Sequence, residues 1–371
     1  MLLSRSVIVG FNLKKMKTVI LVGAGSTLSD AGSKPKKDKP PLDRGFFSGC
    51  EKLGHKEFPS IQKYLITNYD IDPVSIEHDS LERIMAIIYA DINNPILQNS
   101  AVEAFRNIIR LFNRRIAETT NSLNISNRSN LFRIIAKKLS SGITPDDLSI
   151  ITFNQDIHIE KTLEKIQSTK KYSSYGSIFS FPDCYRIDGA SSRLSRPRGK
   201  ASMFPTLVNP DQGISIYKLH GSLNWFSTHT SQDVPKRAIL SRTKKFKITP
   251  RKYLKVGMTF TAGKRTSHTF PLIIPPVNHK AAIIHEDLHP LWEQAEIRLR
   301  EADEIIVFGY SCPPTDFESA NMLRRATNSG VNPQSFVVID PSPSTFHRYI
   351  DVTCLNHLAF FRDCNAYIEK G

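Results

Sequence analysis

The feature that most constrains the fold is a short apolar run that leads directly into a pair of glycines. Thr18 to Val22 reads TVILV, and Gly23-Ala24-Gly25-Ser26 follows without a gap. A continuous run of β-branched and aliphatic residues is typical of a strand buried on both faces of a parallel sheet. Two glycines at the end of this strand let the backbone approach a pyrophosphate closely. The backbone amides at the start of a following helix would then face that anion. A tight strand-to-helix turn without a ligand would use the same residues.

Four further apolar runs end in polar or glycine residues in the same manner. They are Leu148 to Phe153 before Asn154-Gln155-Asp156, Ile214 to Leu219 before His220-Gly221, Glu304 to Phe308 before Gly309-Tyr310-Ser311, and Phe336 to Ile339 before Asp340-Pro341. Helical patterns lie between these runs, and such alternation predicts an α/β fold, a Rossmann-like doubly wound parallel sheet. Ligands of this architecture bind at the carboxyl ends of the strands. We therefore expect these strand ends to form the functional site.

A long helical block separates the first two predicted strands. Apolar residues recur at helical spacing on three faces: Leu81, Ile84, Met85 and Ile88; Val102, Phe105, Ile109, Phe112 and Ile116; and Leu131, Ile134, Ile135 and Leu139. We interpret residues from about 46 to 141 as a helical insertion in a sheet domain that spans 18–371, preceded by a short extension at 1–17. Further along, we expect one helix from Leu288 to Leu299, another after an N-cap at Asp316, and short strands at 272–274 and 358–361.

Positive charge is concentrated in one part of the chain. The net charge is +15, and residues 189–285 contain 17 Lys or Arg against two acids. Within a basic irregular region at about 189–270, the run from Lys236 to Lys255 has nine basic residues and no acid. Such a run could follow a nucleic-acid backbone. It could also be a solvated hairpin or a docking surface for an acidic protein.

Composition and missing motifs exclude several classes of protein. The five cysteines include no CxxC pair, which argues against a zinc ribbon or a disulfide framework. No stretch approaches the ~18 to 20 apolar residues of a membrane span. The amino terminus lacks the small-residue cleavage site of a secretory signal, so we expect a cytoplasmic protein. No Walker, GxSxG or HExxH motif is present, and His158 with Glu160 has poor spacing for a metal, so no metal is expected.

Polar residues at the strand ends provide the candidate chemistry. Asn154 can hold a hydroxyl or a water, Asp156 can accept a hydrogen bond from an amide or a ribose, and His220 offers a titratable imidazole beside a glycine. Asp340 ends a strand where doubly wound folds place an acid on a ribose hydroxyl. Each has a purely structural alternative, which is an Asx turn for Asn154 and Asp156, a structural role for His220, and a plain turn for Asp340.

The order of these motifs, GAGS, TFNQD, LHGS, FGYS and IDPS, resembles that of the sirtuin family. The resemblance implies that Asn154 and His220 are catalytic, with Asn154 orienting the nicotinamide ribose and the attacking water, and His220 acting as a base or as a partner of a ribose hydroxyl. It also implies a set of NAD-binding residues. Gly23, Ala24, Gly25 and Ser26 would hold the pyrophosphate, Asp156 the carboxamide, Gly309, Tyr310 and Ser311 the adenosine side, and Asp340 the adenosine ribose.

The chain departs from protein-deacylating sirtuins in two ways, because it lacks their four-cysteine zinc ribbon and Pro40 to Phe47 replaces their Phe-Arg segment. Both departures resemble the prokaryotic sirtuin-like effectors of antiphage defence. The resemblance therefore implies an NAD+ glycohydrolase with NAD as its substrate and no metal. The alternatives are an NAD-dependent protein deacylase or ADP-ribosyltransferase, and a nucleotide- or nucleic-acid-binding subunit. The resemblance to these effectors further implies that the activity is controlled by a homo-oligomer, or by a partner such as a HerA-type ATPase or an Argonaute-like protein.

Overall fold

The structure is a computed structural model that describes residues 16–32, 39–40, 43–75, 80–180, 183–186, 213–229, 246–248, 259–262, 265–274, 288–328 and 333–370. Its centre is a six-stranded parallel sheet in the order β10-β9-β8-β1-β2-β3. The strands are β1 (Thr18–Val22), β2 (Leu148–Thr152), β3 (Ser215–Lys218), β8 (Glu304–Phe308), β9 (Ser335–Ile339) and β10 (Ala359–Phe361). This sheet confirms the predicted Rossmann-like doubly wound α/β fold.

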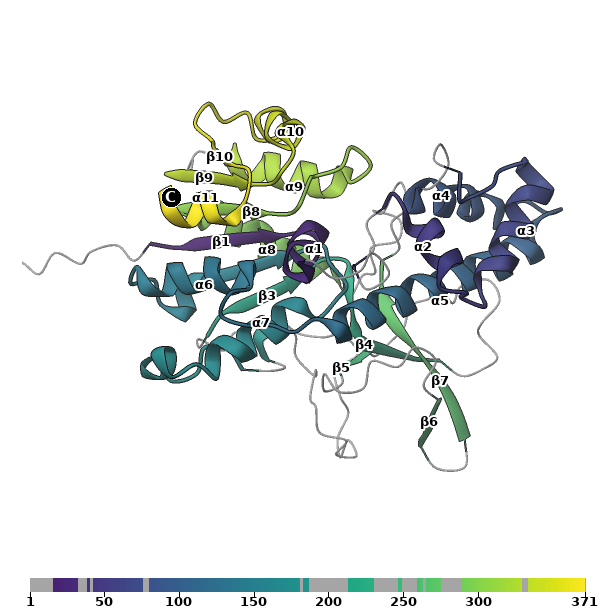
Figure 1. The fold of residues 1–371 in the computed structure, drawn as a ribbon, viewed down its shortest axis with the longest axis horizontal. Helices are drawn as coiled ribbons and strands as arrows, with labels where there is room; N and C mark the ends of the chain where they lie inside the picture. Colours follow the sequence, from purple (N-terminus) through teal and green to yellow (C-terminus); the bar gives the residue numbers. More distant parts are fainter. Residues whose placement is uncertain are drawn as a thin grey trace, which may run out of the picture.

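The helices around this sheet form two contacting groups (Figure 1). The first contains α1 (Ala24–Ala31), α6 (Asn130–Ser140), α7 (His158–Gln167) and α11 (Cys364–Lys370), and the second contains α8 (His289–Glu301), α9 (Phe317–Thr327) and α10 (Pro343–Thr353). A right-handed crossover places its helix on one face or the other according to the direction in which the chain moves along the sheet. The chain moves one way through β2 to β3 and the opposite way through β8, β9 and β10. The switch point, where such sheets bind ligands, therefore lies between β1 and β8.

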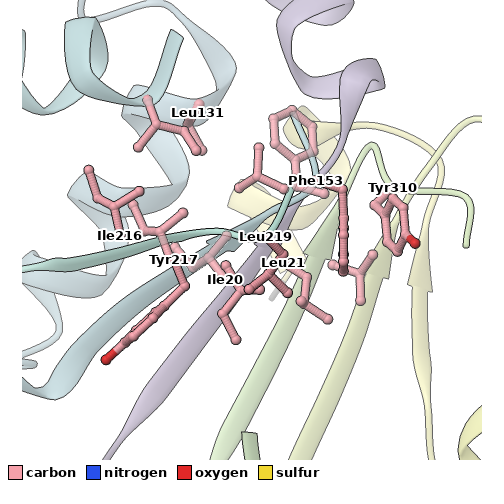
Figure 2. Close-up of a cluster of buried hydrophobic side chains, with 14 of the residues drawn as sticks. Ile20, Leu21, Leu131, Phe153, Ile216, Tyr217, Leu219 and Tyr310 are labelled. Atoms are coloured by element: carbon pink, nitrogen blue, oxygen red, sulfur yellow. The ribbon is translucent and has the colours of Figure 1, made fainter. Parts of the chain in front are cut away.

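The core lies in the middle of the sheet. Every residue of β1, β2 and β8 is buried, as the continuous apolar runs predict. Figure 2 shows Leu131 of α6 above the strands, and Phe153 and Tyr310 just beyond the carboxyl ends of β2 and β8. The apolar core therefore reaches the candidate site itself.

The first part of the helical block extends away from the sheet (Figure 1). It consists of α2 (Phe46–Lys52), α3 (Phe58–Tyr69), α4 (Leu81–Asp91) and α5 (Gln98–Ser122), with α3 and α4 packed against α5. By contrast, α6 packs on α1, α7 and α11 beside the sheet. The faces expected on α4 and α6 are buried, whereas on α5 Val102 and Ile109 are only half-buried. The face that α5 buries includes Ala101, Ala104 and Ile108, because small alanines allow neighbouring helices to approach closely.

A second, antiparallel sheet follows β3 in the sequence, with the strand order β5-β4-β7-β6. Its strands are β4 (Gly221–His229), β5 (Phe246–Ile248), β6 (Thr259–Ala262) and β7 (Arg265–Ile273). The expectation of a basic irregular region with one short strand at 272–274 was therefore wrong where the structure describes the chain. These strands escape a search for continuous apolar runs because antiparallel strands carry mixed sequences. Residues 187–212 and 230–245 of the basic region lie outside the described residues.

The remaining regular segments are short 3-10 helices at Pro145–Asp147, Lys170–Tyr175 and Asp183–Tyr185. Across the described residues, none of the helices has the length and apolar character needed to span a bilayer. Residues 1–15 of the expected amino-terminal extension lie outside the described residues.

Candidate functional site

Two glycine motifs meet backbone to backbone at the switch point. The amide of Gly23 donates to the Phe308 carbonyl over 3.1 Å, and the amide of Gly25 donates to the Gly309 carbonyl over 2.9 Å. A Cβ atom on Gly309 would lie 2.2 Å from the Ser26 nitrogen, and a Cβ on Gly23 would lie 2.4 Å from Cα of Tyr310. Gly309 also has a φ of +63°, which disfavours a side chain. The turn after β1 and the turn after β8 therefore require glycines in order to touch.

In the predicted pyrophosphate turn, some hydrogen-bond donors already bind the protein's own backbone. The helix α1 begins at Ala24, and the Ser26 hydroxyl and amide both donate to the Gly23 carbonyl, over 2.7 and 3.0 Å. Ser26 is fully buried, whereas Ala24 is exposed and Gly25 half-buried. In this structure Ser26 thus shapes the turn from inside. The face that a phosphate could approach is formed by Ala24 and Gly25.

Asn154 and Asp156 meet through a residue that sequence reasoning missed. The Asn154 side-chain amide lies 3.3 Å from the Thr27 hydroxyl, and that hydroxyl donates to Oδ2 of Asp156 over 2.8 Å. The other Asp156 oxygen accepts from the backbone amide of His158 over 3.0 Å, as in an Asx turn. All these side chains are buried. The structural and chemical interpretations of Asp156 therefore coexist, because the turn fixes a carboxylate that keeps further acceptor capacity.

His158 extends this network to a helix terminus. Its Nδ1 atom lies 3.4 Å from the Thr27 hydroxyl and its Nε2 atom 2.8 Å from Oδ2 of Asp30. Asp30 also accepts from the backbone amides of Asn130 and Leu131, which begin α6. His158 is therefore held between α1 and α7 as part of a buried polar network. Among the described residues, no group of three or more His, Cys, Asp or Glu side chains is arranged to hold a metal ion.

His220 lies in an aromatic environment next to this network. The ring centroid of Phe153 is 5.3 Å from that of His220, with the rings edge to face, and the Phe153 ring stacks on Tyr310 at 4.2 Å. Trp292 of α8 lies 6.1 Å from His220. The Nε2 atom of His220 is 3.9 Å from Oδ2 of Asp316. Asp316 was predicted as the N-cap of α9, and it occupies that position, but its side chain makes no capping hydrogen bond.

The strand ends on the other side of the switch point carry Asp340 and the FGYS motif. Oδ1 of Asp340 accepts from the Ser342 amide over 2.9 Å and from the Thr345 hydroxyl over 3.1 Å. Burial raises the pKa of the Asp340 carboxyl above its ordinary value, and these two hydrogen bonds oppose that shift. Ser311 is exposed, and the amide of Gly309 donates to the Ile339 carbonyl over 3.2 Å. Asp340 and Gly309 thus end neighbouring strands.

Gln155 and Lys218 tie the ends of β2 and β3 together. The Gln155 side-chain amide donates to the Ile274 carbonyl over 3.4 Å. The Lys218 ammonium, fully buried, donates to the Asp156 carbonyl and lies 3.0 Å from Oε1 of Glu160. A buried ammonium requires such partners. These contacts hold Asn154, Asp156 and His220 on one edge of the sheet.

No protein-family model matches the sequence, and no curated protein matches it. Similar chains occur among solved structures. One is described as a Sir2 homologue in complex with NAD, with 14% identity and a TM-score of 0.44, covering 95% of this chain and 86% of that chain. Another is a Sir2 homologue mutant with 2′-O-acetyl ADP-ribose, with 13% identity and a TM-score of 0.43, covering 95% and 89%. A third is a Sir2 protein bound to a propionylated peptide, with 11% identity and a TM-score of 0.40, covering 96% and 92%.

Proposed function

We propose that the protein is an NAD+ glycohydrolase that releases nicotinamide and ADP-ribose. The observation that carries the proposal is that three motifs follow the carboxyl ends of neighbouring strands beside the switch point: the glycine turn after β1, Asn154 after β2 and His220 after β3. Doubly wound sheets bind dinucleotides across such a point. Asp340, on the far side of the switch point, is the carboxylate that we assign to the adenosine ribose.

The chemistry requires little more than a held sugar and an activated water. In the proposed mechanism the bond between C1′ and nicotinamide breaks through an oxocarbenium-like state. Nicotinamide leaves as a neutral ring, so the leaving group needs no general acid. Asn154 orients the ribose and the water, and His220 takes the proton that the water loses as its oxygen bonds to C1′. His220 then releases this proton to solvent, which balances the net reaction.

Asp156 is the residue that we assign to the nicotinamide carboxamide. Thr27 and the His158 amide each donate to one of its oxygens, which fixes the plane of the carboxylate. Each carboxylate oxygen can accept a further hydrogen bond, so an amide N–H of the substrate can be added without breaking these contacts. Preorganisation of this kind supports catalysis because the site does not reorganise during the reaction.

The test is to incubate the purified full-length chain with NAD and to measure nicotinamide and ADP-ribose. We expect Asn154→Ala and His220→Ala each to lower the rate by about 10²-fold or more, as the loss of a general base or a positioning group does. Circular dichroism of each variant should match the wild type. EDTA should leave the rate unchanged, because no step of the mechanism uses a metal.

Other products would identify another function. Nicotinamide release that requires an acylated lysine peptide would indicate a deacylase, and ADP-ribose attached to protein would indicate a transferase. Tight NAD binding without any release would indicate a binding subunit. Full activity of either alanine variant would remove that residue from the catalytic role.

A hydrolase that depletes NAD must be controlled, and we propose that this protein is a cytoplasmic antiphage defence effector that acts when assembled. Control would come from a homo-oligomer or from a partner such as a HerA-type ATPase or an Argonaute-like protein. The net charge of +15 and its concentration in the basic region support a docking role, and nucleic acid is the alternative partner. Three lysines of the densest basic run, Lys236 to Lys255, are close together in the sequence. Of these, Lys247 lies in β5, whereas Lys244 and Lys245 lie outside the described residues.

A further inference from the structure

Asp316 occupies the N-cap position of α9 without capping the helix. An aspartate at this position ordinarily accepts hydrogen bonds from amides of the first turn, but the Asp316 side chain makes no capping bond. Its Oδ2 atom instead accepts a hydrogen bond of 2.8 Å from the Tyr310 hydroxyl, and the same atom lies 3.9 Å from Nε2 of His220. The carboxylate therefore faces His220 and not its own helix.

Both members of the His220–Asp316 pair are buried, which strengthens the electrostatic interaction between them. The Asp316 side chain is 2% exposed and the His220 side chain is 6% exposed. A carboxylate removed from water needs hydrogen-bond donors and a positive charge, and a buried imidazolium needs a negative one. Burial also raises the pKa of the Tyr310 hydroxyl well above its ordinary value, so this hydroxyl keeps its proton and donates without adding charge. The same Asp316 oxygen that approaches the imidazole thus accepts a hydrogen bond from a neutral donor.

Two aromatic side chains also pack around the His220 ring. Phe153 meets the ring edge to face, and Trp292 lies on α8 with its Nε1 atom donating to the Leu219 carbonyl over 3.1 Å. Among the titratable groups of the described residues, Asp316 lies 3.9 Å from His220, and the Tyr310 hydroxyl donates to that carboxylate. A positive charge that forms on His220 therefore has the Asp316 carboxylate within ion-pair distance.

We propose that Asp316 is the positioning residue for His220, an inference that rests on the proposed NAD hydrolysis. When the attacking water bonds to C1′, its proton moves to His220 and an imidazolium forms. Asp316 stabilises that imidazolium through Nε2 and fixes the ring, while remaining ionised, as an orienting carboxylate does beside a catalytic histidine. Oδ2 of Asp316 and Nε2 of His220 lie 3.9 Å apart, which is within the range of an ion pair once the ring is protonated.

Kinetics of the full-length chain with NAD test this role. We expect Asp316→Asn, which keeps the shape of the side chain, to lower kcat by about 10²-fold or more and to change KM by less than about 3-fold, since it removes an interaction made in the transition state. Asp316→Glu, which restores the charge, should recover part of kcat. In the His220→Ala background, Asp316→Asn should cost nothing further, because Asp316 acts through His220.

Asp91 provides a matched control for the loss of a buried carboxylate. It is likewise buried and accepts a hydrogen bond of 2.7 Å from a tyrosine hydroxyl, that of Tyr64, but it lies in the helical block on α4. Asp91→Asn should therefore leave kcat unchanged. The proposal is overturned if Asp316→Asn keeps the wild-type kcat. It is also overturned if Asp316→Asn lowers the kcat of His220→Ala by the same factor by which it lowers the kcat of the wild type.

A second measurement needs no turnover. NMR of ¹⁵N-histidine-labelled protein at one fixed pH near neutrality reports the protonation of the His220 ring, and His220→Ala assigns its signal. We expect a larger imidazolium fraction in the wild type than in Asp316→Asn, and identical signals would refute the pairing. A wild type with the paired signal but without nicotinamide release would refute the proposed hydrolysis alone. The two failures are therefore distinguishable.

Discussion

The two glycine turns of the switch point can be in contact only because residue 309 has no side chain. Gly309 combines a φ of +63° with a Cβ direction that leads to the Ser26 nitrogen at 2.2 Å and the Gly25 carbonyl carbon at 2.5 Å. An L-residue in this left-handed region costs roughly 1–2 kcal/mol in any surrounding. The overlap with backbone atoms adds to this cost, because no flexible side chain can move aside.

We therefore predict that Gly309→Ala lowers the free energy of unfolding by about 4 kcal/mol or more, the range of exceptional substitutions. Gly45 is the matched control, since it is in the left-handed region with a φ of +80° and a ψ of 10°, and nothing lies within 4 Å of its would-be Cβ. Gly45→Ala should cost only the roughly 1–2 kcal/mol of the backbone conformation. Urea unfolding of both variants checks the difference, and equal costs would contradict the steric argument.

Asp340 allows a prediction about pH. Burial raises the pKa of its carboxyl above the ordinary 3.8, so the folded chain holds this proton more tightly than the unfolded chain does. The contribution of Asp340 to stability must then decline as pH rises from about 3.8 through the raised pKa. Relative to Asp340→Asn, the wild type should lose stability across this interval and show a constant difference at neutral pH. Urea unfolding at a series of pH values measures it, and a difference that moves in favour of the wild type would contradict it.

At the scale of single residues, only part of the candidate site could be predicted from the sequence. Asn154, Asp156, His220 and Asp340 follow recognisable strands, so their meeting at one edge could be predicted from topology. The role of Asp316 could not, because an aspartate before a helix indicates a cap and nothing local shows that its carboxylate turns inward. Thr27 is buried on α1, and its hydrogen bond to Asp156 joins residues far apart in sequence.

At the scale of elements, a buried ion pair joins α6 to the sheet. The Lys138 ammonium lies 2.6 Å from Oε1 of Glu304, the first residue of β8, and Glu304 also accepts from the Thr18 hydroxyl at the start of β1. Both charged side chains are about nine-tenths buried, at 11% and 9% exposure. Removing one partner leaves a buried charge, which is far more costly than removing both.

We predict that Lys138→Met lowers the free energy of unfolding by about 3 kcal/mol or more and that adding Glu304→Gln restores at least half of this loss. Lys17 provides the control, because its pair with Glu301 has a length of 3.0 Å but both side chains are 42% exposed. Lys17→Met should cost less than about 1 kcal/mol. Chemical denaturation of the four proteins measures these values, and a double variant as unstable as Lys138→Met would count against the ion-pair argument.

Elements differ in how readily their sequences reveal them. The strands of the main sheet could be predicted because both of their faces are covered, which demands continuous apolar runs. The second sheet could not, because strands such as β4 and β7 mix polar and apolar residues, and the basic charge of the segment suggested irregular structure. The apolar face of α5 could be predicted only in part, since periodicity of large residues overlooks the alanines that pack against α3 and α4.

At the scale of the whole molecule, the two appended units lie beyond the carboxyl ends of the main sheet (Figure 1). The second sheet begins at Gly221, directly after His220, and the Ile274 amide donates to the His220 carbonyl over 2.9 Å. The helical block reaches the other member of the pair, because Glu82 of α4 accepts a hydrogen bond from the Thr315 hydroxyl, next to Asp316. One unit thus contacts the backbone of His220, and the other contacts the residue next to Asp316.

This arrangement predicts that the helical block sets the position of Asp316. Thr315→Val keeps the shape of the side chain but removes its hydrogen bond to Glu82, so we expect kcat for NAD to fall about 3- to 10-fold, the effect of a lost hydrogen bond of ~1 kcal/mol. NAD affinity should stay unchanged, and the loss should vanish in the Asp316→Asn background. Asn107→Ala is the control, since it removes a 3.0 Å hydrogen bond to Ser60 inside the block and should leave kcat unaltered. If Thr315→Val slows Asp316→Asn as much as it slows the wild type, the helical block does not act through this carboxylate.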